Sequence, residues 1–314
     1  MMRTLLHDAV CTGNLEELKK LYEAGEKCQD QTQLFVAAAQ FGHLDIIKYL
    51  SSIGFKWDFQ TASFAAGSGH IHCLKYLVDN GWELTKSVAQ SSFSNVECLK
   101  YVFELRPDLF ETCGVQEVAA CADYGWLDSL KFAHEVIHLP WDSLTFLNAA
   151  SKGHIDCIKY AFENGCKLSY TATFAAARGG HIECLKYLVE NGCEVVFGAV
   201  EIAIGNHNFT CLKYIIETVP QVLDSNIPKF FEALNSRLTM YVPCRHDWLV
   251  MYLIQLLQSG HNFDPYSNLR MYVTNFIQLK QDVTCIVTSS LGLFVCDIRI
   301  VERHILRFIF PQPL

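Results

Sequence analysis

The sequence predicts an all-α protein that forms a solenoid of eight to nine helix–turn–helix repeats. A motif of the form Gly-His-Ile-Glu-Cys-Leu-Lys-Tyr recurs along the chain, with its clearest copies at 69–76, 153–160 and 180–187. The lysine of the motif returns every 25 to 31 residues, at Lys19, Lys48, Lys75, Lys100, Lys131, Lys159, Lys186 and Lys213. A near-constant period of this size is typical of a solenoid, in which each unit buries its apolar face only against its neighbours.

The residues before the turn predict the first helix of each repeat. These stretches are short and rich in alanine, as at 34–39, 64–66, 146–150 and 174–177. Small side chains allow neighbouring helices to pack closely, because the distance between helix axes depends on the side chains at the contact. A glycine then marks the turn, at Gly42, Gly69, Gly125, Gly153 and Gly180.

The residues after the turn predict the second helix. Apolar side chains recur there at helical spacing, as in Ile182, Leu185, Leu188 and Val189. The helix is predicted to end at an Asn-Gly pair, where glycine accepts the left-handed conformation of a helix C-cap. These pairs stand at 80–81, 164–165 and 191–192.

Two parts of the chain depart from the repeat. Residues 91–95 lack the Ala-Ala and Gly-His elements, and Pro107 lies in a longer link, so we expect local irregularity there. After about Pro220 the pattern relaxes, and 229–241 and 248–257 are candidates for the two helices of a degenerate ninth unit. Terminal repeats are expected to be atypical because they cap the stack.

The predicted domain organisation follows from these breaks. Residues 1–217 form the repeat array, and 218–280 form degenerate terminal repeats or a helical cap. Residues 281–314 form a non-repeat C-terminal tail, which is a cap, a partner-docking segment or a poorly ordered end.

Composition narrows the classes of function. The net charge of −8 argues against a nucleic-acid binder, which needs a basic surface. The sequence contains no targeting segment at its start and no apolar stretch long enough to span a membrane. Five of the 14 cysteines occupy the same place in their repeats, at Cys73, Cys98, Cys157, Cys184 and Cys211. This placement predicts small buried apolar residues in a reducing, cytoplasmic compartment rather than a disulfide framework.

No residue pattern indicates catalysis or a cofactor. The His-x-x-Cys spacing occurs in three repeats, at His70/Cys73, His154/Cys157 and His181/Cys184, and pairs in different repeats lie too far apart for one tetrahedral zinc site. Core packing and turn hydrogen bonds are therefore the favoured roles. The sequence has no Walker loop, His-Glu-x-x-His or Gly-x-Ser-x-Gly motif, so we expect a non-enzyme without metal or cofactor.

The lysine row allows two interpretations. An acidic residue usually stands three positions earlier, as in Asp45 and Lys48 or Glu183 and Lys186, and such residues share a helix face. Local charge pairing on a solvated outer face is favoured over a basic stripe for an anionic partner. The tyrosine that follows each lysine is favoured as a core residue packed between repeats over a binding residue.

The turn sequences resemble the ankyrin repeat. The helix-one motif of that family ends in Ala-Ala-x-x-Gly-His, which stands here at 38–43, 65–70 and 149–154. Ankyrin repeats run about 33 residues, so a period of about 27 implies that the hairpin fingers are shortened or missing. The resemblance covers roughly residues 5–217, and short repeats of this kind are similar to those of large DNA viruses, amoebae and other protists.

The resemblance implies a function and a binding surface. It implies a non-catalytic scaffold, expected to be a monomer, that binds a protein partner on its concave face, in the host cytoplasm if the protein is viral. It places candidate contacts just before the Gly-His turn, at Gln40, Phe41, Ser68, Asp123, Tyr124, Lys152 and Arg178. The alternative is an adaptor that selects a client with its repeats and docks through its C-terminal part onto a larger complex such as a ubiquitin ligase.

Overall fold

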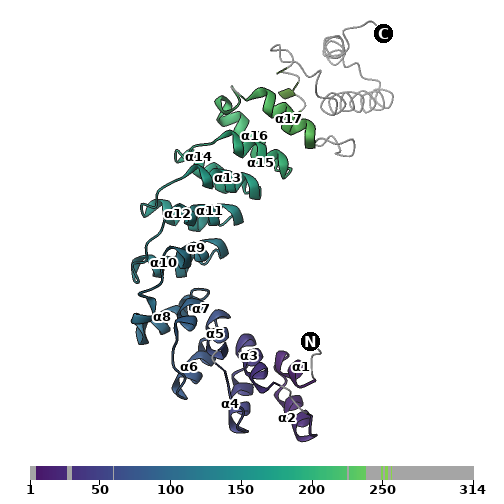
Figure 1. Cartoon of the computed structure of the whole chain (residues 1–314), viewed down its shortest axis with the longest axis vertical. Helices are drawn as coiled ribbons and strands as arrows, with labels where there is room; N and C mark the ends of the chain where they lie inside the picture. Colours follow the sequence, from purple (N-terminus) through teal and green to yellow (C-terminus); the bar gives the residue numbers. More distant parts are fainter. Residues whose placement is uncertain are drawn as a thin grey trace, which may run out of the picture. The chain divides into compact units, whose positions relative to one another are not determined.

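The computed structural model describes residues 5–26, 30–58, 60–224 and 226–237, and the single residues 249, 252, 253 and 256. Every regular element in this part of the chain is helical, which confirms the predicted all-α class. The chain divides into two compact units, Met1–Leu168 and Ser169–Leu314, each of which is described by itself (Figure 1). The predicted tail at 281–314 lies outside the described residues, as does most of 218–280, and the predicted domain boundaries stay predictions.

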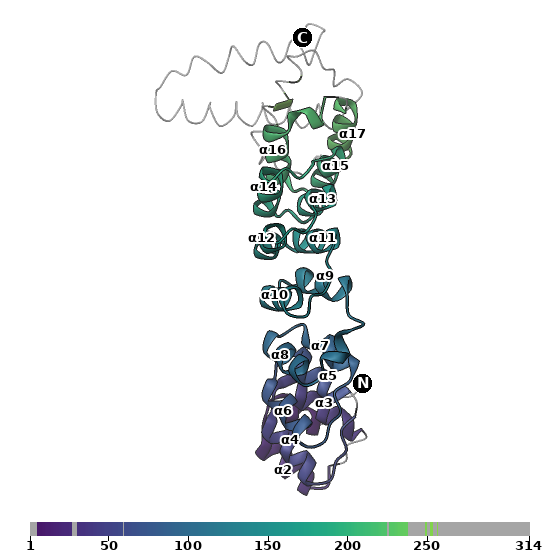
Figure 2. The same ribbon diagram turned by 90° about the vertical axis from the view of Figure 1, so that its left-hand side faces the viewer.

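The first unit consists of six helix pairs. The first helix of each pair is here called an A helix: α1 (Leu5–Cys11), α3 (Gln31–Phe41), α5 (Gln60–Gly67), α7 (Lys86–Ser92), α9 (Val115–Tyr124) and α11 (Ser143–Lys152). The second is called a B helix: α2 (Leu15–Glu23), α4 (Leu44–Ser52), α6 (Ile71–Asp79), α8 (Val96–Leu105), α10 (Leu127–Glu135) and α12 (Ile155–Glu163). Figure 2 shows the A helices of this unit as one layer and the B helices as a second layer.

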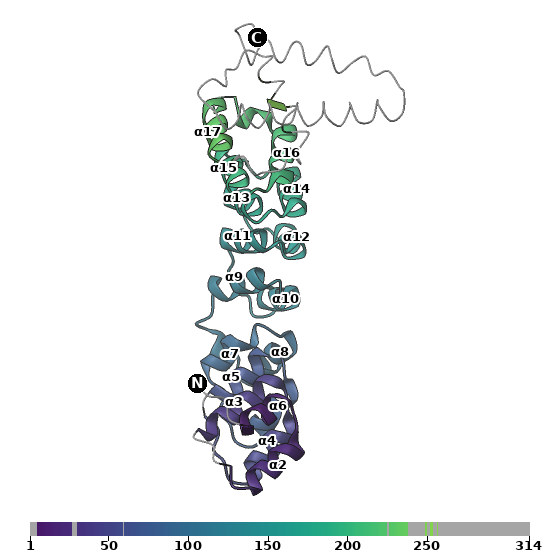
Figure 3. The same ribbon diagram turned by 90° about the vertical axis from the view of Figure 1, so that its right-hand side faces the viewer.

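The second unit continues the same alternation. Its A helices are α13 (Tyr170–Gly179), α15 (Phe197–Gly205) and α17 (Ile227–Arg237), and its B helices are α14 (Ile182–Glu190) and α16 (Phe209–Thr218). A short 3₁₀ helix, η2 (Pro220–Val222), joins α16 to the segment before α17. The two layers of this unit are visible in Figure 3. The described residues thus contain eight helix pairs and one further A helix, which confirms the helix–turn–helix solenoid.

Small and large apolar residues divide the core between the layers. In α13, Ala172 and Ala176 are completely buried, and this helix packs directly against α15. In α14, Leu185 and Leu188 are completely buried at the helical spacing that the sequence predicts. Alanine in the A helices and leucine in the B helices therefore produce the close stacking of successive repeats.

The repeated cysteines belong to this core. Cys73, Cys98, Cys157, Cys184 and Cys211 are each at most 1% exposed, and none of them is in a disulfide. Burial raises the pKa of the Cys73, Cys157 and Cys211 thiols to about 11, which keeps them protonated at neutral pH. The predicted role as small buried apolar residues is confirmed.

The links between repeats are short and contain no strand among the described residues. Asn164 caps α12, and Gly165 follows with a φ of +83°. Two residues of successive links then meet, because the Cys166 thiol donates a hydrogen bond to the Asp142 carbonyl oxygen over 3.2 Å. A thiol–carbonyl contact between neighbouring links thus occupies the place of the missing hairpin finger.

The irregularity predicted at the fourth repeat and the link after it is confirmed as a change in packing. The longer link folds into a 3₁₀ helix, η1 (Pro107–Phe110), that contacts α7 and α8. Phe110 is buried, and its ring meets Phe93 edge-on at 5.8 Å and Phe103 at 5.5 Å. The rings of Phe93, Phe103 and Phe110 thus pack together where the repeat is irregular.

Candidate protein-binding surface

The seven candidate contact residues lie at or just after the C-terminal ends of A helices, and we call them the A-helix-end residues. Six of them belong to the first unit: Gln40 and Phe41 on α3, Ser68 after α5, Asp123 and Tyr124 on α9, and Lys152 on α11. Arg178 lies at the same place on α13 of the second unit. All are exposed except Asp123, which is half-buried.

Two of these residues are large exposed aromatic side chains. Phe41 is 48% exposed and Tyr124 is 63% exposed. Tyr124 stacks on Trp126 with ring centroids 4.6 Å apart and planes 15° apart, and Phe41 stacks on His43 at 6.3 Å. Each ring is therefore supported from one side and open on the other.

The turn histidines hold the backbone of these residues. The Nε2 atom of His70 donates to the Gln40 carbonyl oxygen over 3.0 Å, and that of His154 donates to the Asp123 carbonyl oxygen over 3.0 Å. His43 makes the same contact with Cys11 over 3.3 Å. The acceptor is always the carbonyl two residues before the turn glycine of the preceding repeat. The predicted turn hydrogen bonds of these histidines are confirmed.

Other side chains take over where histidine is missing. In the irregular fourth repeat, the Ser94 hydroxyl donates to the Gly67 carbonyl oxygen over 2.6 Å. In the second unit, the Asn208 amide donates to the Arg178 carbonyl oxygen over 2.9 Å. The sequence analysis missed both substitutions, although each donor lies at or next to the position of the turn histidine.

The turn glycines are required for this contact. Gly125 has a φ of +73°, which favours glycine, and a Cβ atom there would lie only 2.5 Å from Nδ1 of His154. The same approach occurs between Gly42 and His70, also at 2.5 Å. Because these carbonyls already accept a hydrogen bond from the next repeat, the side chains at these positions stand on a fixed backbone.

The lysine row differs from the prediction of local charge pairing. Glu16–Lys19 and Glu183–Lys186 do form ion pairs at 3.0 Å, at exposed positions where such pairs stabilise little. Five lysines of the row place Nζ over an aromatic ring of the next B helix, and Lys19 does so over Tyr49 while it is paired with Glu16. The other four contacts join Lys48 to Tyr76 at 5.9 Å, Lys75 to Tyr101 at 5.3 Å, Lys100 to Phe132 at 5.9 Å and Lys131 to Tyr160 at 5.8 Å. In the described part of the chain, Lys48, Lys100 and Lys131 form no ion pair with the acidic residue three positions earlier.

In the sequence, the feature that could have predicted these lysine–ring contacts is the Lys-aromatic dipeptide that recurs in the repeats. A cation over a ring is stabilised by about 0.5–1 kcal/mol at an exposed site, and each contact here joins successive repeats. The predicted core role holds only for Tyr160, which is buried. The other tyrosines of the row are half-buried, and a lysine of the preceding repeat lies over the rings of Tyr49, Tyr76 and Tyr101. Among the described residues, no group of three or more His, Cys, Asp or Glu side chains is placed to hold a metal ion.

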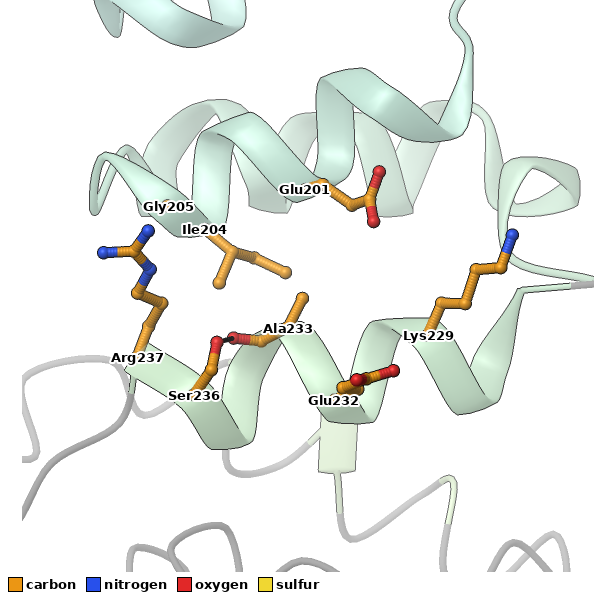
Figure 4. A pocket seen from close by; sticks show the side chains of 8 residues that line it. All are labelled: Glu201, Ile204, Gly205, Lys229, Glu232, Ala233, Ser236 and Arg237. Carbon is orange, nitrogen blue, oxygen red and sulfur yellow. Dashed lines mark hydrogen bonds between the residues drawn. The ribbon is translucent and has the colours of Figure 1, made fainter.

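A cavity of about 500 Å³ lies between α15 and α17 of the second unit (Figure 4). Gly205 and Ala233 leave it open because their side chains are absent or small. Its charged rim consists of Glu201 on α15 and of Lys229, Glu232 and Arg237 on α17. The sequence analysis missed this cavity because it depends on which faces of a degenerate repeat meet.

The fold and the exposed helix ends define a class of protein, a helical-repeat solenoid that presents a varied surface on a repeated backbone. The family model described as "Ankyrin repeats (3 copies)" matches residues 6–88, 118–199 and 146–229, together more than half of the 314 residues. The chain therefore belongs to the ankyrin-repeat family.

One similar solved structure is the crystal structure of the human ASB11 ankyrin repeat domain. It is 19% identical, the match covers 64% of this chain and 92% of that one, and the TM-score is 0.33. No curated protein sequence matches the chain.

Ankyrin repeats are general protein–protein interaction modules, and their fold is typically a non-catalytic scaffold. Within the described residues, no helix combines the length and the apolar character that crossing a membrane requires.

Proposed function

We propose that this protein is a non-catalytic scaffold that binds a protein partner on its concave face, through the A-helix-end residues. One observation carries the proposal: exposed, varied side chains stand on a backbone that the next repeat fixes. His70 and His154 hold the backbone, while Phe41 and Tyr124 point outward.

Variation from repeat to repeat supports the proposal. The two residues before the turn are Gln40-Phe41, Asp123-Tyr124 and Ser151-Lys152, in three repeats that keep the turn glycine and the alanine three residues before it. A constant backbone with changing side chains allows one scaffold to match one particular partner surface. Exposed aromatic residues are the side chains that most often dominate such interfaces, at about 2 kcal/mol or more each.

Affinity capture from cell lysate with mass spectrometry tests the proposal. The full chain is compared with a variant carrying Phe41→Ala, Tyr124→Ala, Lys152→Glu and Arg178→Glu. A matched control carries Lys20→Glu and Leu105→Ala, which remove an exposed charge and a 47% exposed apolar side chain on B helices. Partners lost only with the first variant support the proposal, and partners lost equally with both variants contradict it.

The adaptor alternative concerns the part of the chain after residue 217. Its test requires a cut beyond α17, because Phe230 and Leu234 of that helix are buried and α17 packs on α15. Removal of 281–314 should leave every partner bound if the protein is a simple scaffold. Selective loss of a large complex, with the client retained, would favour the adaptor.

The proposal includes a monomeric protein that works without cofactor in the cytoplasm. None of the ten cysteines among the described residues is in a disulfide, which supports a reducing compartment. Light scattering of the purified chain tests the monomer. A dimer that dissociates in the Phe41→Ala, Tyr124→Ala variant would instead make a second copy the partner.

A further inference from the structure

Two neighbouring A helices of the first unit carry no charge. Neither the 11 residues of α3 nor the eight of α5 include Asp, Glu, Lys or Arg. The B helices paired with them each carry charged residues, such as Asp45 on α4 and Lys75 on α6. Charge is therefore segregated between the layers in this part of the stack.

The exposed side chains of α3, of α5 and of the residue that follows α5 form a surface that we call the neutral strip. Its members are Gln31, Gln33, Gln40, Phe41, Gln60, Phe64 and Ser68. Phe41 and Phe64 are 48% and 38% exposed. The strip thus combines exposed aromatic rings with uncharged polar groups.

The carboxylates that precede α3 and α5 in the chain are engaged at the helix starts. Asp30 accepts a hydrogen bond from the Thr32 backbone N–H over 3.0 Å, and Asp58 accepts one from the Gln60 backbone N–H over 2.9 Å. Both cap their helices, where their charge is stabilised by the exposed N–H groups. Neither carboxylate is thereby directed toward the rings of the strip.

Two glutamines of the strip have unused hydrogen-bonding groups. The side-chain amides of Gln40 and Gln60 make no hydrogen bond to any described residue. A glutamine amide offers two donors and one acceptor oxygen, which matches the N–H and C=O groups of a peptide backbone. These amides can form hydrogen bonds with the backbone N–H and C=O groups of a partner, but they carry no charge that could neutralise a charged partner side chain.

The loss of water on binding favours partner side chains without charge at this surface. A carboxylate brought against Phe41 or Phe64 would lose water without gaining a counter-charge, which is strongly unfavourable. A cation would lose water as well, and the face of a ring at an exposed site returns only about 0.5–1 kcal/mol. Aromatic rings with few charges are also what the buried centres of protein interfaces contain. The surface therefore favours a neutral, apolar segment.

We propose that the neutral strip binds an extended, uncharged partner segment, with an apolar side chain against Phe41 and Phe64 and its backbone amides toward Gln40 and Gln60. The assignment rests on the proposed function, because it names the chemistry of the partner at one part of the proposed surface. It makes this end of the scaffold selective against acidic and basic segments.

Selection from random 12-residue peptides displayed on phage tests the assignment, with the purified full chain as bait. A parallel selection uses the Phe41→Ala, Phe64→Ala variant, and peptides recovered only with the wild type depend on the strip. These peptides should be poor in Asp, Glu, Lys and Arg. Adding one charge to such a peptide should weaken its binding about tenfold or more, equivalent to about 1.4 kcal/mol.

Two single-charge variants sharpen the test. Gln60→Lys places a charge on the strip and should shift the selected peptides toward acidic sequences. Ser52→Lys adds the same charge at an exposed position on α4 and should change nothing. Circular dichroism confirms that each variant is folded.

The outcomes separate the two proposals. Strip-dependent peptides that are rich in charge, or a Gln60→Lys selection like that of the wild type, would overturn the neutral assignment and leave the binding surface intact. Identical selections by the wild type and the double alanine variant would overturn both proposals for this part of the stack.

Discussion

His154 and Asp123 are joined across two repeats: Nε2 of the histidine donates to the carbonyl oxygen of the aspartate over 3.0 Å. The bond fixes the backbone of the preceding repeat next to the exposed Tyr124. Equivalent bonds from His43, His70, Ser94 and Asn208 join four further pairs of successive repeats. Stacking and display of the candidate contacts thus depend on the same hydrogen bond.

His154→Ala should lower the free energy of unfolding by about 1–2 kcal/mol, because a half-buried carbonyl oxygen loses its donor. Urea unfolding at pH 7 measures this. His154→Asn is the matched control, since Asn208 makes the same contact with its amide. Equal losses from the two variants would show that the hydrogen bond does not contribute.

Gly125→Ala should destabilise the protein more than Gly165→Ala. Both glycines have a left-handed φ, +73° and +83°, so both substitutions cost about 1–2 kcal/mol of backbone strain. Only at Gly125 does the new Cβ also meet a neighbouring ring, 2.5 Å from Nδ1 of His154, whereas nothing lies within 4 Å at Gly165. Urea unfolding of both variants gives the comparison.

The double variant Gly125→Ala, His154→Ala isolates the clash. Removal of the imidazole should recover part of the Gly125→Ala loss, so the two single losses should not add. Additive losses would contradict the close approach of these two residues.

Leu185→Ala should lower the free energy of unfolding by about 2–5 kcal/mol, because it empties a completely buried site in the core of α14. Val189→Ala in the same helix is a control at a half-buried position and should cost less. Circular dichroism should show a strongly helical wild-type protein. A mainly β spectrum would contradict the fold.

Stability should fall as the pH rises from about 9 toward about 12. Burial raises the pKa of the Cys98 thiol from 9.0 to about 12, so the folded state keeps a proton that the unfolded state has already lost. The stabilisation is complete below pH 9 and is lost as the pH rises toward the folded value. Urea unfolding between pH 8 and pH 10.5 measures the slope, and Cys98→Ala should make it shallower.

The helix–turn–helix architecture could be predicted because it depends on local sequence. Alanine-rich stretches, turn glycines and Asn-Gly caps repeat along the chain. The Lys48–Tyr76 contact could not be predicted, since it depends on how two repeats pack rather than on either repeat alone. The roles of Ser94 and Asn208 could not be predicted for a related reason. Different side chains donate a hydrogen bond to the equivalent carbonyl oxygen in different repeats. The cavity beside Gly205 depends on the packing of an atypical last repeat.

The central claim is that a protein partner binds the A-helix-end residues, and the dissociation constant of a purified partner tests it most directly. Phe41→Ala with Tyr124→Ala should weaken binding about 100-fold or more, because two exposed aromatic contacts are lost. The B-helix control, Lys20→Glu with Leu105→Ala, should leave the dissociation constant within about threefold of the wild-type value, a change under about 1 kcal/mol. Equal dissociation constants for the wild type and the aromatic variant, or a larger loss in the control, would contradict the claim.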